Sequence, residues 1–489
     1  MAPWSCVGIV YLSVVAALLR PAAADHIKVD VQDPSPFHPL SLFFIYSQAD
    51  APDAVQPASV NFYNFQLSAE PAVVANLTYG SVEVGLIRYE DYVLLDMGLA
   101  CDAGRMNWTI GAMKGGQQMK GGQHRVPQVF QLLVPFRQGS RGVSKKFPIM
   151  QTGLYVLSLG HCEPSMKGVK VTGDVIMKNP FGYLPGSEYK KLSLYLSLAF
   201  VYVGLGTIWL ILSLIYHKEL FNIQICIGVV LFMGLVEVSL WYVTYFTWNK
   251  TGDKNLFMFY GAIFASVVKS IFSYMLVLVG AMGWGITRPS LDKWTHCMIR
   301  ICVIVFIPLD YIRRVITNFQ DTEVPLAFIL CILLPCSIMN GLIFYWVFSS
   351  LGDAIDTLTA QKQTEKLKLF HRLWCGLVIA LVLLTIGQLA EFGMVSVEVE
   401  VRWPYQWIFE DAVSHVLFIL VLLFQMILFR PHKESHRYAY SQQLADEEAD
   451  PGEEANQDPF TISDAFDDSG DEEFDLGNTP QPTTVGAKS

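Results

Sequence analysis

The sequence predicts a seven-helix transmembrane bundle that follows a β-sandwich domain outside the membrane and precedes a disordered acidic tail. The chain of 489 residues is 52% hydrophobic and only 16% charged, whereas soluble proteins average about 25% charged residues. Seven long apolar segments lie between residues 188 and 432. Fourteen acids lie between Asp446 and Asp475, a stretch without Lys or Arg that accounts for the net charge of −10. This composition argues against a soluble enzyme and against a nucleic-acid-binding protein.

Residues 1–24 are predicted to be a cleaved signal peptide. Val7–Leu19 is an apolar run of 13 residues, too short to cross a bilayer comfortably. Ala22-Ala23-Ala24 follows it and is typical of a small-residue cleavage site. Cleavage after Ala24 would place the mature N-terminus in the lumen of the secretory pathway. Because no Lys or Arg precedes the apolar run, an uncleaved anchor is the alternative.

Residues 25–187 are predicted to form the lumenal β-sandwich. Short stretches rich in β-branched and aromatic residues recur here, separated by Pro, Gly, Asn and Asp, and this spacing is typical of a sandwich. The predicted strands are Leu42–Tyr46, Val60–Leu67, Tyr92–Leu99, Val129–Val134, Leu154–Leu159 and Val169–Ile176.

Three sequons and two cysteines are candidate sites of N-glycosylation and disulfide formation in the lumen. Asn76 and Asn107 begin sequons within the predicted sandwich and are expected glycan acceptors. A third sequon at Asn249 lies too near the membrane for a glycan to be expected. Cys101 and Cys162 are the thiols of the predicted lumenal domain, and a disulfide between them is the simplest interpretation in an oxidising lumen. Two free buried thiols are the alternative.

Residues 188–432 are predicted to cross the membrane seven times, because each apolar segment is near or above the ~20 residues that a helix needs. Seven crossings from a lumenal start place the C-terminus in the cytosol. The loops assigned to the cytosol hold more Lys and Arg than the lumenal loops, as the positive-inside rule requires. The predicted spans are about 192–216, 221–246, 257–286, 297–317, 324–348, 373–391 and 409–430.

Ionisable residues inside these spans are the candidate site residues, because a charge within the membrane usually faces the bundle interior and has a partner. Glu237 on the second span and Lys269 on the third lie at similar depths, about 14–18 Å from the lumenal ends at 1.5 Å per residue, so that they can pair. On the fourth span, Asp310 precedes Arg313 and Arg314 by three and four residues, the spacing of neighbours on one helix face.

The lumenal end of the seventh span adds Glu410, Asp411 and His415. Asp411 and His415 are i,i+4 neighbours, and together with the other intramembrane charges they predict a polar cavity that opens to the lumen. This cavity could hold an ion, a lipid headgroup or cargo. The alternative is structural pairing that only fixes helix packing. No catalytic or metal-binding motif is present, so neither enzyme activity nor a cofactor other than a bound phospholipid is expected.

The cytosolic side has two further features. Pro335 in the fifth span predicts a local kink, and Leu351–Phe370, between the fifth and sixth spans, predicts a helical extension or surface helix. Residues 433–489 predict a disordered acidic tail. Within it, Asp458-Pro459-Phe460 is a candidate sorting motif for cytosolic adaptors; a merely solvated acidic tail is the alternative.

Several segments carry a resemblance to a known family. They are Asn179–Pro185, Gly283–Pro289, Trp346–Leu351, Asp411–His415, Arg430-Pro431 and Arg437–Tyr440. In their order along residues 150–440 they are similar to the lung seven transmembrane receptor, or GOLD-domain seven-transmembrane, family. Asp411–His415 and the Arg-Tyr-Ala-Tyr segment resemble the transmembrane protein 87 branch.

The resemblance implies a GOLD-type β-sandwich over a seven-helix bundle similar to that of the Wnt carrier Wntless. It also implies residence in Golgi membranes, a role in Golgi–endosome traffic and a lipid-occupied cavity. Cation conduction has been proposed for this branch. Carried over to this chain, Asp411 and His415 would line the cavity from the seventh span, with Glu237 and Lys269 from the second and third.

We therefore expect a non-enzymatic, multi-pass Golgi membrane protein that takes part in traffic between Golgi, endosomes and plasma membrane. Its expected partners are membrane lipid, a membrane-protein or lipidated cargo, and sorting adaptors that bind the acidic tail. The alternatives are a cation channel that serves Golgi pH homeostasis, an orphan G-protein-coupled receptor, and a ligand-binding module confined to the sandwich.

Overall fold

The structure is a computed structural model that describes the two folded parts of the chain. The described residues are 26–34, 37–51, 54–69, 80–93, 101–102, 105–106, 129–136, 142–162, 168–217, 220–284, 292–318, 326–395, 397 and 399–431. The predicted signal peptide, the sequons at Asn76 and Asn107, and Asp458, Pro459 and Phe460 in the tail lie outside these residues.

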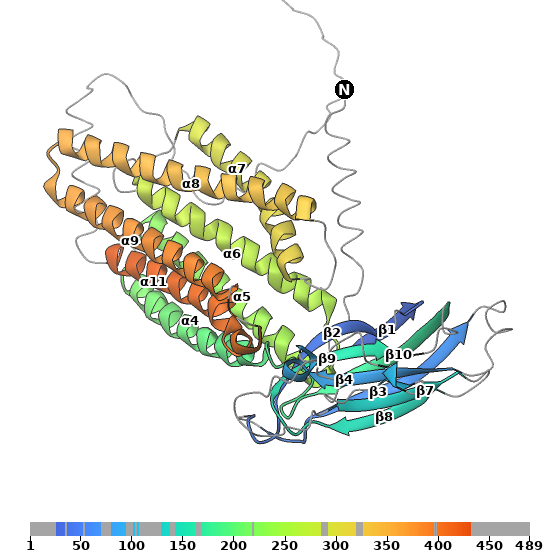
Figure 1. The fold of residues 1–489 in the computed structure, drawn as a ribbon. Coiled ribbons are helices and arrows are strands. Elements are labelled where there is room, and N and C mark those ends of the chain that lie inside the picture. Colours follow the sequence, from blue (N-terminus) through green and yellow to red (C-terminus); the bar gives the residue numbers. More distant parts are fainter. Residues whose placement is uncertain are drawn as a thin grey trace, which may run out of the picture.

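Two four-stranded antiparallel sheets form a sandwich in the N-terminal part (Figure 1). One sheet has the strand order β1-β10-β3-β8 and the other β2-β9-β4-β7. The strands are β1 His26–Gln32, β2 Phe37–Ile45, β3 Ser59–Ala69, β4 Ser81–Arg88, β7 Val129–Pro135, β8 Val143–Pro148, β9 Gly153–Gly160 and β10 Val169–Lys178. Cys101–Asp102 (β5) and Arg105–Met106 (β6) form a separate short ribbon.

Alternating side chains of the two sheets build the core of the sandwich. In β3, Val60 and Phe62 are fully buried, whereas Tyr63 on the other face is 59% exposed. A bulge where β10 pairs with β3 places Gly173 against the Phe65 ring, and a Cβ at Gly173 would lie 2.6 Å from that ring. The glycine therefore lets two strands of different length stay paired around a large aromatic side chain.

Five of the six predicted strands overlap observed strands, one predicted strand is wrong, and five observed strands were not predicted. Tyr92, assigned to a strand at Tyr92–Leu99, lies instead on the short helix α3, Tyr89–Val93. Glu90 and Asp91 in its first turn favour a helix N-terminus. The strands β1, β4 and β8 of the sandwich and the two-residue strands β5 and β6 were missed, although β1 and β4 alternate apolar and polar residues over part of their length.

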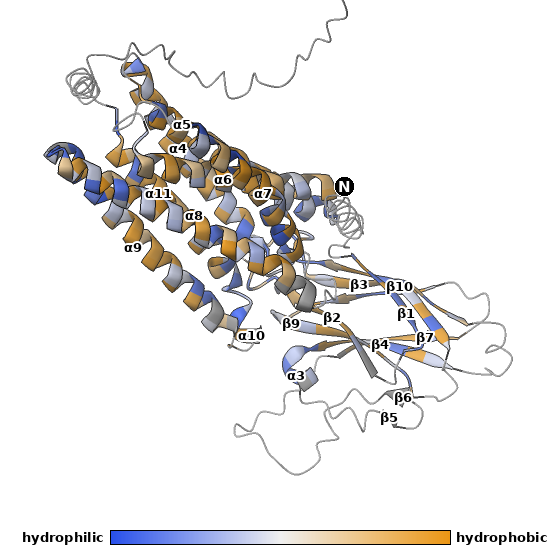
Figure 2. Ribbon diagram, turned by 90° about the horizontal axis from the view of Figure 1, so that it is seen from above, coloured by the Kyte–Doolittle hydropathy of each residue, from blue (hydrophilic) through white to orange (hydrophobic). Residues whose placement is uncertain are grey.

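Seven helices of the described part are long and apolar enough to cross a membrane. They are α4 Tyr189–Ile215, α5 Asn222–Thr251, α6 Leu256–Met282, α7 Lys293–Asn318, α8 Leu326–Ala360, α9 Thr364–Val395 and a last helix that starts as the π-helical turn η4 Ile408–Ala412 and continues as α11 Val413–Leu428. Figure 2 shows their predominantly hydrophobic residues. The predicted fold class, a β-sandwich before a seven-helix bundle, is thus confirmed.

The helices pack in a chain of neighbours that leaves room in the centre. α4 packs on α5, α5 on α6, α6 on α7 and α8, α8 on α9, and α9 on α11. The sandwich lies at one end of the bundle (Figure 1). At the opposite end, α8 and α9 form a hairpin around Lys362, so residues 351–370 are largely helical, as predicted. Pro335 lies inside α8.

The sandwich and the bundle are joined by a hydrogen-bonded connector, residues 179–185. The Asn179 side chain accepts a hydrogen bond from the Tyr46 N–H, 2.9 Å away, and donates one to the Leu184 carbonyl, also at 2.9 Å. From the end of α5, the Asn249 side chain accepts from the Leu184 N–H at 3.1 Å and donates to the Phe181 carbonyl at 3.0 Å. Asn179 within the connector and Asn249 of α5 therefore fix this loop with four side-chain hydrogen bonds.

A glycine and a tryptophan complete this junction. Gly182 has a φ of +145°, and a Cβ there would lie 2.3 Å from the Asn249 Oδ1 atom. Trp403, after the short helix α10 (Val399–Arg402), is 4% exposed. Its ring centroid lies 5.2 Å from those of both Phe44 and Tyr46 of the sandwich. The connector and the tryptophan thus orient the sandwich over the mouth of the bundle.

Candidate functional site

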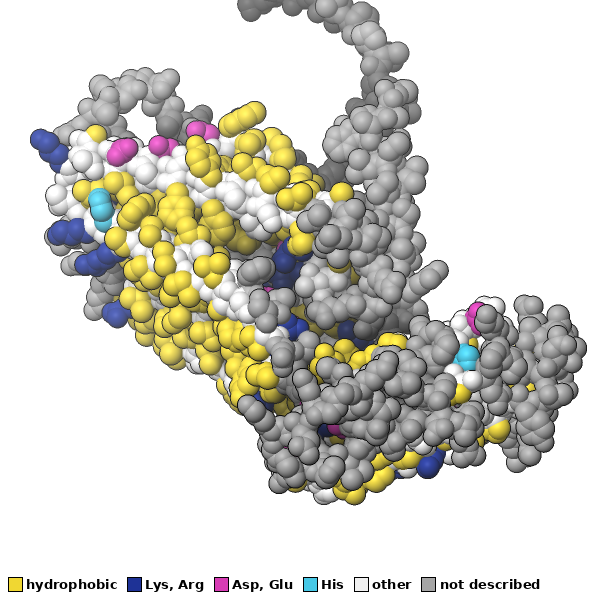
Figure 3. Space-filling model, in the orientation of Figure 1, with side chains coloured by type: hydrophobic (Ala, Val, Ile, Leu, Met, Phe, Trp, Pro, Cys, Tyr) yellow, Lys and Arg dark blue, Asp and Glu magenta, His cyan; other side chains and the backbone are white. Residues whose placement is uncertain are grey.

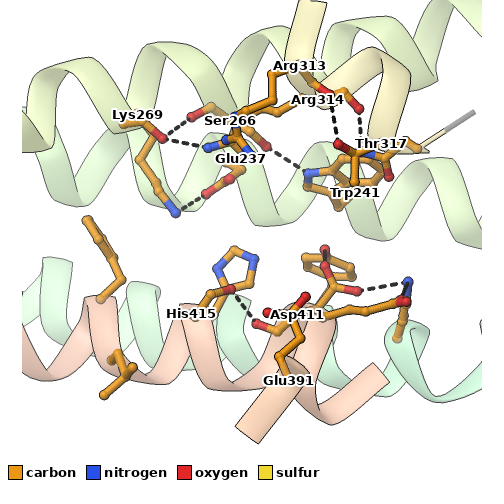
Figure 4. A pocket seen from close by; sticks show the side chains of 18 of the residues that line it. Glu237, Trp241, Ser266, Lys269, Arg313, Arg314, Thr317, Glu391, Asp411 and His415 are labelled. Atoms are coloured by element: carbon orange, nitrogen blue, oxygen red, sulfur yellow. Dashed lines mark hydrogen bonds and ion pairs between the residues drawn. The ribbon is translucent and has the colours of Figure 1, made fainter. Parts of the chain in front are cut away.

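A cavity of about 1590 Å³ lies inside the bundle and extends to the sandwich. Residues of α4, α5, α6, α7, α8, α9, η4 and α11 line it, and β1 and β2 contribute at the sandwich end. Figure 4 shows two walls that face each other: Glu237, Lys269 and Arg314 on one, and His415, Asp411 and Glu391 on the other. The charged candidates of the sequence analysis therefore meet in one space, except Asp310, whose partners Arg313 and Arg314 line the cavity.

Glu237 and Lys269 form an ion pair between α5 and α6. The Lys269 Nζ lies 2.6 Å from the Glu237 Oε2, and their side chains are only 8% and 3% exposed. The ammonium also lies 4.3 Å from the centroid of the Phe418 ring on α11. At this burial each charge depends on the other, because loss of one partner leaves an uncompensated ion in a low dielectric.

Asp310, Arg313 and Arg314 form a second cluster on α7. The Asp310 carboxylate, 2% exposed, lies 2.6 Å from Arg313 Nη2 and 2.8 Å from Arg314 Nε. Arg314 also donates a hydrogen bond of 2.9 Å to the Ser270 hydroxyl of α6. Two guanidinium groups share one carboxylate, so this cluster has an excess positive charge where it lines the cavity.

A third cluster, not singled out by the sequence analysis, surrounds Lys191 in the first turn of α4. Its Nζ lies 3.0 Å from a carboxylate oxygen of each of Glu188, Glu410 and Asp411. The Tyr195 hydroxyl donates to the other Asp411 oxygen at 3.1 Å. Three carboxylates around one ammonium make this part of the wall acidic. The available signal was a lysine at the start of an apolar span, three residues after an acid.

The π-helical turn η4 places the two acids of this cluster on the cavity wall. Glu410 and Asp411 lie within Ile408–Ala412, which has the wider π-helical backbone, and such turns recur at functional sites. The adjacent His415 is buried, with its ring edge toward Tyr195 at 5.6 Å. Its Nδ1 has no hydrogen-bond partner among the described residues. Asp411 thus forms an ion pair with Lys191 and accepts a hydrogen bond from Tyr195. The structure shows no hydrogen bond between Asp411 and His415.

Beyond these charges, the part of the cavity between α8, α9 and α11 is mainly apolar, although Asn340, Gln388 and Gln425 also line it. Its lining includes Ile343, Phe344, Val347, Leu377, Leu381, Leu384, Val421 and Leu422. The cavity is therefore amphipathic: ions line one region and aliphatic and aromatic side chains line another.

Two covalent predictions touch the described residues. Cys162 is disulfide-bonded, but the side chain of Cys101 lies outside the described residues, so their pairing stays a prediction. Asn249 uses its side-chain amide in two hydrogen bonds of the connector. A glycan on this amide would break them, which gives a structural reason not to expect one.

Taken together, a β-sandwich fixed to the end of a seven-helix bundle with a charged internal cavity defines a class of multi-pass membrane protein. The family model "GOST, seven transmembrane domain" matches residues 190–436, half of the chain. The chain therefore belongs to the GOST seven-transmembrane family.

Similar proteins agree with this assignment, and several of them are named transmembrane protein 87. Transmembrane protein 87A of Xenopus tropicalis is 27% identical over 330 residues, 64% of this chain and 60% of that protein. Transmembrane protein 87B of Mus musculus is 27% identical over 269 residues, 54% of this chain and 47% of that protein. Membrane protein PTM1 of Saccharomyces cerevisiae is 26% identical over 353 residues, 69% of this chain and 65% of that protein. The chain spans about half of the length of the animal relatives.

Proposed function

We propose that this protein binds a phospholipid, or the lipid group of a membrane-anchored cargo, in the cavity of its bundle. The observation that carries the proposal is the amphipathic lining. A lipid has a charged headgroup and apolar chains, and the cavity offers ions in one region and an apolar surface in another. Its volume of about 1590 Å³ also exceeds the ~300–1,000 Å³ typical of pockets for small molecules.

The charges of the lining favour a headgroup that carries both signs. Arg313 and Arg314 share Asp310, which leaves a positive excess on α7. Lys191 is shared by three carboxylates, which leaves a negative excess near η4. An arginine pair suits a phosphate, and carboxylates suit an ammonium group. The Nδ1 of His415, which has no hydrogen-bond partner in the described part of the chain, adds a buried polar atom that a ligand or a water would satisfy.

We further propose that the protein works without enzyme activity in Golgi and endosome membrane traffic. In this proposal the sandwich faces the lumen, the tail faces the cytosol, and adaptors read Asp458-Pro459-Phe460. The predicted signal peptide, the excess of basic residues in the loops assigned to the cytosol, and the family resemblance support it.

The lipid proposal is tested by mass spectrometry of the protein purified in a mild detergent. We expect phospholipid to remain bound to the wild type and to be lost from Arg313→Gln/Arg314→Gln. Lys145→Gln/Lys146→Gln, two exposed changes in β8, serve as the matched control and should retain the lipid. Equal lipid in all three proteins would place it on the outer surface of the bundle.

A second measurement separates lipid binding from conduction. The wild-type protein in liposomes is expected to carry no cation current while the lipid occupies the cavity. A current that disappears in Asp411→Asn would instead support a channel.

A further inference from the structure

The end of the bundle away from the sandwich carries a surface that we call the basic end. It comprises Lys362, Lys366, Lys368 and Arg372 of the α8–α9 hairpin and Arg430 after α11, and all but Lys366 are exposed. Figure 3 shows Lys and Arg side chains gathered at this end. The hairpin also carries three acids, Asp353 and Asp356 on α8 and Glu365 on α9, against the five bases of the basic end.

Aromatic side chains indicate where this surface lies relative to a membrane. Tyr345 on α8 is 73% exposed and Trp374 on α9 is 43% exposed, and such residues concentrate at the membrane–water interface. At 1.5 Å per residue, Lys368 lies about 9 Å and Lys362 about 18 Å beyond Trp374 along the hairpin. The screening length at physiological salt is about 8 Å, so headgroups attract Lys362 only weakly.

The chain itself contains a segment of complementary charge on the same side. Residues 446–475 hold 14 acids and no Lys or Arg, and they begin 18 residues after α11 ends at Leu428. A chain of 18 residues can span at most about 60 Å when fully extended, so the tether does not prevent this segment from reaching the hairpin. Tethering at this length corresponds to an effective concentration in the millimolar range.

We infer that the acidic segment Asp446–Asp475 docks on the basic end of its own chain. Opposite charge supplies the attraction, and the tether keeps a weak, salt-sensitive contact occupied. Asp458-Pro459-Phe460 lies within the segment, so docking would compete with any adaptor that reads it. The inference holds whether or not that triplet is a sorting motif, since it depends only on charge, position and reach.

A zero-length carboxyl-to-amine cross-linker tests the inference on the full-length protein in nanodiscs of neutral phosphatidylcholine. At low salt we expect links from Lys362 and Lys368 to carboxylates of residues 446–475, identified by mass spectrometry. In about 1 M salt, where the screening length falls to about 3 Å, the yield should fall about tenfold. Absence of these links at low salt would overturn the inference.

Matched variants separate charge from the loss of a reactive amine. Lys362→Glu should lower the yield of links at Lys368, whereas Lys362→Arg, which keeps the charge, should leave it unchanged. Asp353→Lys/Asp356→Lys should raise the yield of links at Lys368. Lys145 and Lys146 in the sandwich should stay unlinked to the tail; links there as frequent as at Lys368 would overturn the inference. So would loss of the Lys368 links in nanodiscs with anionic phosphatidylserine, which would show that the membrane surface is the true partner.

Discussion

The charged side chains within the bundle pair in two ways: with a residue three or four positions away on the same helix, or with a residue on another helix. Asp310 bonds Arg313 and Arg314 three and four residues away on the same helix, a pairing set by helix geometry. Glu237 and Lys269 meet from different helices, and Lys191 meets Glu410 and Asp411 across most of the bundle domain. The long-range pairs therefore depend on helix packing and in turn help to specify it.

For individual residues, the Glu237–Lys269 pair gives the first prediction. Glu237→Gln or Lys269→Met alone should destabilise the bundle by about 3–5 kcal/mol, because the remaining charge stays buried and uncompensated. The double change should recover much of the loss. Thermal unfolding in detergent measures both effects. The control is Lys250→Met, an exposed change on α5, the helix that carries Glu237. Strictly additive losses in the double variant would contradict the pairing.

At the level of helices, the packing of α4 against α5 depends on the close approach of the Tyr202 ring to Gly234. A Cβ at Gly234 of α5 would lie 2.4 Å from the Tyr202 ring of α4, whereas a Cβ at Gly204 of α4 would meet nothing within 4 Å. Gly234→Ala should therefore destabilise the protein by about 1–3 kcal/mol through overpacking. Gly204→Ala should be neutral or slightly stabilising, because alanine favours a helix by up to about 1 kcal/mol. Equal effects on the unfolding temperature would show that α4 and α5 do not pack this closely.

The contact of Trp403 with the sandwich gives a prediction about the junction. Trp403→Ala removes a buried ring that packs against Phe44 and Tyr46, and about 3 kcal/mol of stability is expected to be lost by analogy with buried core tryptophans. Tyr405→Ala, two residues away and 54% exposed, is the control. Hydrogen exchange should rise in residues 179–185 and in η4 for Trp403→Ala only. An increase confined to the sandwich would mean that the ring does not link the two parts.

For the whole molecule, orientation in the membrane is the first testable property. If the sandwich faces the lumen, the protein should carry two N-glycans, on Asn76 and Asn107, and none on Asn249, whose amide is hydrogen-bonded. Glycosidase digestion should then increase mobility by two glycans, and Asn76→Gln/Asn107→Gln should abolish the shift. A shift that survives in this variant, or an unglycosylated wild type made in cells, would contradict this orientation.

The tail yields the last prediction. Phe460→Ala should change the distribution of the protein between Golgi, endosomes and cell surface without changing its folding, because an aromatic side chain in an acidic segment is available to an adaptor pocket. Surface biotinylation and Golgi co-localisation measure the distribution, and Phe474→Ala in the same segment is the control. If a chain ending at Tyr440 distributes like the wild type, the sorting signal lies elsewhere.

Sequence-based prediction succeeded where the signal is local. The positions of the seven helices follow from apolar runs, and the pairing of Asp310 follows from i,i+3 and i,i+4 spacing. It failed where the signal depends on context: β1, β4 and β8 were missed, Tyr92 was assigned to a strand, and Lys191 was not identified as a site residue. Lys191 is charged and lies at the end of a span, so only its burial by three carboxylates reveals its role.

The sequence alone determined that this protein has seven apolar spans, a strand-rich N-terminal part, a few intramembrane charges and an acidic tail, because hydropathy, periodicity and charge are properties of neighbouring residues. Only the tertiary structure decided that Glu237, Lys269, Arg314 and Asp411 line one cavity, and that two asparagines and Trp403 fix the sandwich over it. Those contacts join residues as far apart as Phe44 and Trp403. Such distances are set by the packing of whole elements, and no local pattern contains them.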